Sequence, residues 1–158
     1  MKKALVAYFS ASGITAGLAK KIAETINADI YEICPQIPYT QDDLNWRNSN
    51  SRSSIEMKDK NCRPPLEYNV PDLSNYEIVF IGFPIWWYRE PSIIDTFVES
   101  CKFNGQTIIP FATSGGSGLG SSAKNIQALA PKAKVAEGKL LNSIEIEGLN
   151  NWAKRYVE

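Results

Sequence analysis

The chain of 158 residues contains no histidine and carries no excess charge of either sign. Without histidine, the most common general base is missing, and so are the Ser-His-Asp triad and most zinc sites. Seventeen basic residues balance seventeen acidic ones, so no net positive field would attract nucleic acid or an anionic membrane surface. We therefore expect no nucleic-acid partner, and chemistry that comes mainly from a bound cofactor.

Long hydrophobic runs and paired cysteines are also missing. No segment approaches the roughly 20 apolar residues that cross a bilayer, so we expect no membrane partner. The basic pair in "MKKALVAYFS" precedes only a short apolar run, which suits a first strand better than a signal peptide. Cys34, Cys62 and Cys101 lie far apart without a CxxC pair, which indicates reduced, structural thiols and a cytoplasmic location.

Apolar runs bounded by turn residues alternate with segments of helical periodicity. This alternation predicts a single α/β domain over residues 1–158, built on a parallel sheet. The expected strands are 4–9, 28–34, 77–83, 107–113 and one near 139–146. The expected helices carry apolar stripes within 14–26, 93–101, 119–130 and 149–157.

Residues 35–72 interrupt the alternation and form what we call the insert. The insert contains five prolines, the polar run "NSNSRSS" and few apolar positions. A structureless loop of this length would be unusual in a compact domain, and Thr40 with Asp43 is typical of a helix start. We expect one or two short helices here, either as a lid over a ligand or as a plain surface excursion.

Three groups of residues follow predicted strands, at the edge where doubly wound sheets bind ligands. The first, "SASGIT", combines three hydroxyls with Gly13 before a helix whose free amides favour an anion. This pattern predicts a phosphate monoester site, although helix capping by Ser12 alone is the simpler alternative. The loop does not match GxGxxG or GxxxxGK(S/T), so dinucleotides and nucleoside triphosphates are disfavoured.

The second and third groups suit the rest of a planar ligand. "FPIWWYREP" places Trp86, Trp87 and Tyr88 at a strand end, where a flat aromatic ligand would stack on them, unless the rings fold back into the core. "TSGGSGLGSS" provides glycines and hydroxyls for close backbone contact with a polar edge, unless it is only a flexible linker. A phosphate pocket, an aromatic wall and a glycine-rich loop together indicate FMN.

These loops resemble those of the flavodoxin family, in particular its small bacterial flavodoxin-like flavoproteins. The first loop is similar to the family's phosphate motif, and Ile14 stands where the family usually has Asn. "FPIWWY", "TSGGSGLG" and the insert segments "PYTQDDLNW", "SRSSIEMKD" and "RPP" also resemble this branch. The resemblance covers nearly the whole chain and implies a flavodoxin-like three-layer α/β/α sandwich with five parallel strands in the order 2-1-3-4-5.

The resemblance also implies which residues bind the cofactor. The implied FMN-binding residues are Ser10, Ala11, Ser12, Gly13, Ile14, Thr15, Pro84, Ile85, Trp86, Trp87, Tyr88, Thr113, Ser114, Gly115, Gly116 and Gly118. The first six would hold the phosphate, the next five would lie along the isoalloxazine, and the last five would lie beside its pyrimidine edge. No catalytic side chain and no metal are expected.

Three functions are open at this point. The first is an FMN-binding redox protein that transfers electrons through its flavin to an unidentified partner protein or small-molecule acceptor. Flavodoxin carriers are typically acidic, whereas this chain is neutral. Neutrality and the insert favour a second function, an FMN-dependent NAD(P)H oxidoreductase acting on a quinone or similar acceptor. The third is a sensor of a phosphorylated ligand without redox function.

Overall fold

The computed structural model contains one sheet in which parallel strands follow the order β2-β1-β3-β4-β5, and β6 also pairs with β4. This order confirms the one that the resemblance implied. The structure describes all residues except 115–117 and 143–145. The elements are β1 Ala4–Tyr8, α1 Ile14–Ile26, β2 Asp29–Glu32, α2 Arg52–Lys58, β3 Ile78–Pro84, α3 Ser92–Ser100, β4 Thr107–Thr113, α4 Ser122–Leu129, β5 Lys134–Val135, β6 Lys139–Leu140 and α5 Ile146–Val157.

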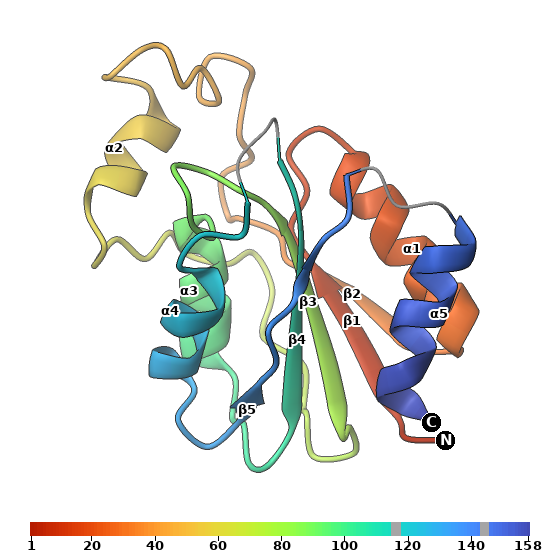
Figure 1. The fold of residues 1–158 in the computed structure, drawn as a ribbon. Helices are drawn as coiled ribbons and strands as arrows, with labels where there is room; N and C mark the ends of the chain where they lie inside the picture. The colour runs from red at the N-terminus through yellow and green to blue at the C-terminus, as the bar shows by residue number, and fades with distance from the viewer. Residues whose placement is uncertain (115–117, 143–145) are drawn as a thin grey trace.

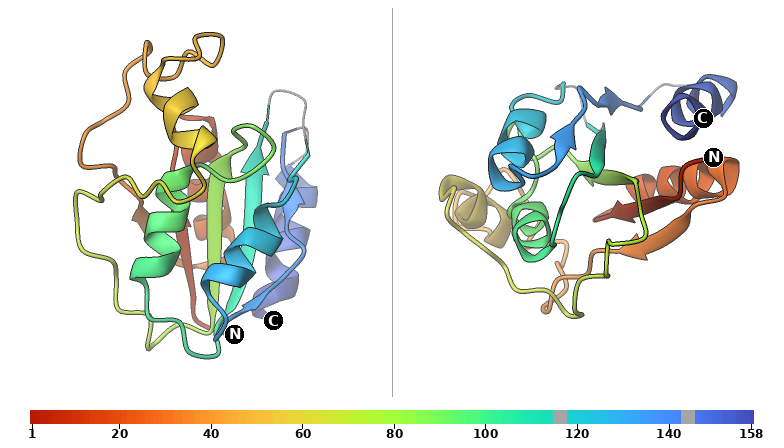
Figure 2. Two further views of the ribbon diagram at one scale, coloured as in Figure 1. Left: turned by 90° about the vertical axis from the view of Figure 1, so that its left-hand side faces the viewer. Right: turned by 90° about the horizontal axis from the view of Figure 1, so that it is seen from below.

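Helices cover both faces of the sheet and give the predicted three-layer fold. α1 and α5 pack together on one face, while α3 and α4 pack together on the other (Figure 1; Figure 2). The two ends of the chain lie side by side, and the amide of Lys2 donates to the carbonyl of Val157 at 2.8 Å. Within the described parts of the chain, no helix is both long and apolar enough to span a membrane.

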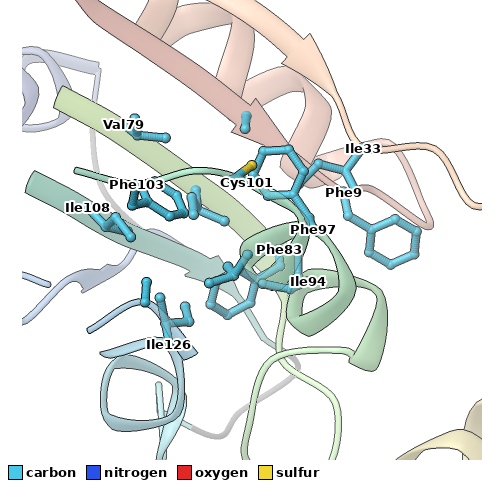
Figure 3. Close-up of a cluster of buried hydrophobic side chains, with 14 of the residues drawn as sticks. Phe9, Ile33, Val79, Phe83, Ile94, Phe97, Cys101, Phe103, Ile108 and Ile126 are labelled. Carbon is cyan, nitrogen blue, oxygen red and sulfur yellow. The ribbon is translucent and has the colours of Figure 1, made fainter. Parts of the chain in front are cut away.

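The central strands are apolar on both faces because each face has its own core. Alternate residues of a strand point to opposite sides, so Ile81 and Phe83 of β3 join the core beneath α3 and α4, whereas Phe80 joins the core beneath α1 and α5. Figure 3 shows side chains of β3, β4, α3 and α4 converging in the first core. β2, at the edge of the sheet, is largely exposed, which agrees with the alternation of apolar and polar residues in its sequence.

The last strand differs from the prediction, because it begins earlier than residue 139 and is divided into β5 and β6. On this side of β4, the carbonyls of Ile108 and Ala112 accept hydrogen bonds from the amides of Ala136 and Leu141. Backbone groups of alternate residues point to the same side of a strand, so Pro110 faces the gap between β5 and β6. Proline has no N–H to donate there. Gly138 passes so close that a Cβ there would lie 2.6 Å from the carbonyl oxygen of Pro110. The strand is therefore interrupted opposite a proline.

Two helix predictions hold only in part, the one over residues 119–130 and the one that starts at Thr40. The apolar repeat that begins at Leu119 enters α4 only at Ser122, because Gly120 between them has φ +59° and cannot continue a right-handed helix. In the insert, Thr40 and Asp43 make the reciprocal hydrogen bonds of a helix start, at 2.9 and 3.1 Å. A single turn follows these bonds, and no helix grows from it.

The insert does contain one of the short helices that we expected, α2. Ser51 caps it by accepting a hydrogen bond from the amide of Ser54. The two ends of the insert are held together where Pro35 and Leu66 form an antiparallel bridge after β2. In Figure 1 and in the left view of Figure 2, α2 lies beyond the start of α3, toward the edge of the sheet where its strands end.

Candidate functional site

The first loop, Ser10–Thr15, joins β1 to α1 and leaves the helix start open. The amide of Gly13 donates to the hydroxyl of Ser10 at 3.0 Å. Gly13 is the N-cap residue with φ 92°, and no side chain caps the helix. The first amides of α1 therefore point into the loop, the arrangement that binds anions in other proteins.

The hydroxyls that the sequence grouped together have different surroundings. Ser12 is exposed, whereas Thr15 is only 2 % exposed. The hydroxyl of Thr15 lies 3.0 Å from the hydroxyl of Thr113, which is also buried. Thr15 thus connects the first loop to the third, while Ser12 and the backbone face outward.

The second loop forms a strained two-residue turn. Trp86 and Arg89 exchange two backbone hydrogen bonds, at 3.0 and 3.2 Å. The residues between them, Trp87 and Tyr88, have φ of 48° and 65°, as in a type I′ turn, a conformation that normally selects glycine or asparagine. Each non-glycine residue in this region costs about 1–2 kcal/mol. Such strain is found mainly at functional sites.

The three aromatic residues of this turn do not behave as one wall. Trp86 is half-buried and makes edge-to-face contacts with Phe9 and Tyr39, at ring-centre distances of 5.6 and 5.4 Å. Trp87 and Tyr88 are 43 % and 72 % exposed. The turn is therefore anchored by one ring and presents the other two to solvent.

The third loop follows β4 and closes against the second. The amide of Ser114 donates to the side-chain oxygen of Asn142 at 2.7 Å, and the Asn142 amide donates back to the Ser114 carbonyl. A Cβ on Gly120 would lie 1.8 Å from the carbonyl oxygen of Tyr88, so only glycine fits there. Of the predicted site residues, Gly115 and Gly116 lie outside the described residues, and Gly118 is exposed.

Two cavities adjoin along Ser12 and Pro84–Trp86. The loop cavity, about 690 Å³, lies between all three loops. It is lined by Ser12, Gly13, Ile14, Gly17, Leu18, Lys21, Pro84, Ile85, Trp86, Thr113, Ser114, Leu141 and Asn142. The insert cavity, also about 690 Å³, is lined by Ala11, Ser12, Leu44, Trp46, Ser53, Pro84, Ile85, Trp86, Trp87 and Tyr88. The structure thus brings residues predicted from all three loops to one place.

A cluster of buried charged residues connects the second loop to the end of α2. Arg89, Glu90 and Asp95 are each less than 7 % exposed, and the Arg89 guanidinium lies 3.4 Å from an Asp95 oxygen. It also donates to the carbonyl of Met57, at the end of α2, at 3.2 Å. Burial, followed by a hydrogen bond with Glu90, raises the pKa of Asp95 to about 9. A proton held between Asp95 and Glu90 would satisfy the two buried carboxylate oxygens that have no hydrogen-bond partner among the described residues.

Several cavity residues were not predicted as site residues. Lys21 lines the loop cavity because it follows Ile14 by two helical turns and shares its face. That spacing could have been read from the sequence. Only the tertiary fold brings four other residues to the cavities, and their local sequence does not identify them as site residues. These residues are Asn142, Leu44, Trp46 and Ser53.

Comparison with known families decides where the chain belongs. The family model described as flavodoxin matches residues 3–156. The chain belongs to the flavodoxin family. The resemblance stated from the sequence is thereby confirmed. A search of curated proteins found no match.

Solved structures agree with this assignment. A Bacteroides uniformis protein described as a flavoprotein is 46% identical, with a TM-score of 0.92, and the match covers 97% of this chain and 98% of that chain. A Bacteroides eggerthii protein described in the same way is 44% identical, with a TM-score of 0.91 and 98% coverage of both chains. A Lactobacillus acidophilus flavoprotein solved in complex with FMN shares the fold, at 21% identity and a TM-score of 0.70, over 89% of this chain and 93% of that chain.

Proposed function

We propose that this flavodoxin-family chain binds FMN in the loop cavity and transfers electrons through the bound flavin. The observation that carries the proposal is the position of this cavity between the open start of α1 and the strained aromatic turn. The FMN complex of the Lactobacillus acidophilus flavoprotein supports the choice of cofactor.

The residues around the loop cavity fit the chemistry of FMN. A phosphate needs donors and positive charge, and the open amides of α1, the Ser12 hydroxyl and the Lys21 ammonium provide both. A flavin ring needs an apolar, aromatic surface, which Ile85 and Trp86 provide. Ile14 is 63 % exposed, so at this position the backbone amide would act in place of a polar side chain.

When bound, FMN supplies the redox chemistry. The chain would fix the phosphate with the first loop, exclude water from the ring with Pro84–Tyr88, and hold the third loop in place through Thr15 and Thr113. In these roles no side chain has to transfer a proton. The free thiols of Cys34, Cys62 and Cys101 agree with the proposed location in the reducing cytoplasm.

The phosphate assignment is tested by comparing FMN with riboflavin, which lacks the phosphate. Ser12→Ala and Lys21→Ala should each weaken FMN binding about tenfold, because each loses a contact to a charged group worth about 1.5 kcal/mol. Riboflavin affinity, measured by flavin fluorescence titration of the apoprotein, should stay unchanged. Lys20→Ala is the matched control, since Lys20 is exposed and lies outside the cavity lining. Equal losses for FMN and riboflavin would contradict the assignment.

A second candidate function is an FMN-dependent NAD(P)H oxidoreductase that reduces a quinone or similar acceptor. The insert cavity beside the proposed flavin site favours it, because an electron carrier between proteins needs no second small-molecule pocket. Steady-state oxidation of NADH or NADPH by the FMN-loaded protein, with a quinone present, separates the two functions. Turnover supports the reductase, whereas an FMN-loaded protein without turnover supports the carrier.

A further inference from the structure

The insert cavity is mostly apolar and is lined by uncharged residues. Eight of its ten lining residues are aliphatic, aromatic or proline, and the other two, Ser12 and Ser53, are neutral. No charged residue lines it within the described parts of the chain. Its chemistry therefore differs from that of the loop cavity, which is lined by Lys21 and the start of α1.

Large aromatic groups are left uncovered around this cavity. Trp46, Trp87 and Tyr88 are 67 %, 43 % and 72 % exposed, and all three line it. Several uncovered rings around one apolar cavity mark a binding surface more often than a plain surface. Trp87 and Tyr88 are also held at positive φ, so the fold tolerates strain in order to place these rings here.

The insert is attached to the second loop by contacts next to the cavity. Tyr39 packs against Trp86 and lies beneath the Arg52 guanidinium, 3.8 Å from its ring centre. The hydroxyl of Tyr39 donates to a carboxylate oxygen of Glu56, and burial together with this bond raises the Tyr39 pKa. Arg89 then joins the end of α2 to the strained turn. These contacts fix the insert against the second loop.

We propose that the insert cavity is a separate binding site for an uncharged, planar, conjugated molecule of the quinone class. The inference rests on the proposed function, in which FMN occupies the neighbouring loop cavity. A nicotinamide dinucleotide is a poorer occupant, because its phosphates require cationic partners. The phosphate of FMN is excluded from this cavity for the same reason. A flat, neutral ring matches the exposed indoles of Trp46 and Trp87.

The direct test follows the indole N–H signals of the four tryptophans by NMR, using FMN-loaded protein and menadione without a reductant. The Trp46 and Trp87 signals should shift saturably. Trp152 is 4 % exposed in the core beneath α1 and α5, so its signal should stay fixed. No shift at Trp46 would overturn the proposal, and so would an equal shift at Trp152.

A variant pair adds an independent measurement. Trp46→Ala should weaken menadione binding about tenfold, the value of one aromatic contact, and leave FMN affinity unchanged. Folding should be unaffected because the side chain is mostly exposed. Tyr68→Ala is the control, since Tyr68 is a 64 % exposed aromatic of the insert outside the cavity lining. Equal menadione affinity in Trp46→Ala and the unaltered protein would count against the site.

A charged probe and an FMN-only titration complete the test. A naphthoquinone sulfonate should bind more weakly than menadione, because no cation among the described residues lines the cavity. Equal or tighter binding would contradict the proposed chemistry.

If FMN alone shifts the Trp46 signal and menadione then has no effect, the flavin itself occupies the insert cavity and the proposal is wrong. If the protein acquires no flavin absorption, the proposed function fails instead, so the two failures are distinguishable.

Discussion

The first and second loops of the site reach the same kind of backbone conformation with opposite residue types. In the first loop the residue at positive φ is Gly13, which adopts it without steric cost. In the second loop the residues are Trp87 and Tyr88, for which positive φ is unfavourable. The first loop therefore uses its backbone, whereas the second keeps two large side chains at the expense of stability. The difference indicates that the side chains themselves are needed in the second loop.

The strained turn persists because its surroundings support it. The hydrogen bonds between Trp86 and Arg89, the close approach of Gly120 to Tyr88, and the buried cluster around Arg89 all act on it. The first loop has less strain to offset, because its residue at positive φ is a glycine. Removing individual supports should therefore affect the second loop most, and the predictions below run from the largest effect to the smallest.

Gly120→Ala should have the largest effect. Its Cβ would overlap the carbonyl of Tyr88, and φ +59° would add backbone strain. We expect the free energy of unfolding of the apoprotein, measured with urea, to fall by about 3 kcal/mol, at the upper end for overpacking. Gly118→Ala in the same loop is the control, because a Cβ there meets nothing within 4 Å and its φ is ordinary. Equal stability of the two variants would disprove the supporting contact.

Asp95→Asn should change how stability depends on pH. The folded protein holds the Asp95 proton up to about pH 9, whereas an unfolded carboxyl releases it near pH 3.8. Between these values the folded state binds more protons, so stability falls as pH rises, by up to about 1.4 kcal/mol per pH unit. The variant, which cannot ionise, should lose this slope in urea unfolding between about pH 6 and pH 7.

Two outcomes check the assignment to Asp95. Asp42→Asn removes an exposed carboxylate and should retain the slope of the unaltered protein. Arg63 and Arg89 both face Asp95 and favour its ionised form, in opposition to burial and Glu90. A slope that is unchanged in Asp95→Asn would mean that the arginines prevail and that Asp95 is ionised at neutral pH.

Trp87→Gly should have the smallest effect on stability and the opposite sign. Relief of positive φ contributes about 1–2 kcal/mol, and the added freedom of glycine in the unfolded chain removes about 0.5–1 kcal/mol of it. We expect the apoprotein to gain up to about 1 kcal/mol and the FMN-loaded protein to lose affinity for menadione, because Trp87 lines the insert cavity. Trp87→Ala retains the strain, so it should lose menadione affinity without gaining stability. The two variants unfolding at the same urea concentration would show that the turn is not strained.

The order of the elements followed from the sequence because apolar periodicity and turn residues act locally. The strand over residues 107–113 and the helix at 14–26 lie where their patterns predicted. The division between β5 and β6 was missed, although Pro110 was visible, because its effect falls on a strand paired with it across the sheet. The local sequence does not show which strand will pair with the side of β4 where Pro110 lacks an N–H donor.

The site was predicted to the level of its three loops but not to the level of its side chains. Ser12 and Thr15 look equivalent in the sequence, yet Thr15 is buried against Thr113, 98 residues away. Trp86 and Trp87 are adjacent and identical, yet one anchors the turn and the other is exposed. Burial depends on what packs opposite a residue, and the sequence of a loop does not contain that information.

The sequence alone determined the α/β alternation, the three ligand loops and the family resemblance, because each depends on residues close together in the chain. Tertiary structure decided which hydroxyls and rings face the two cavities, and it placed Asn142 and Trp46 in their linings. It also decided that Arg89, Glu90 and Asp95, which are near one another in the sequence, are buried beside the end of α2. These outcomes depend on contacts between distant segments, which form only when the sheet brings its strand ends to one edge.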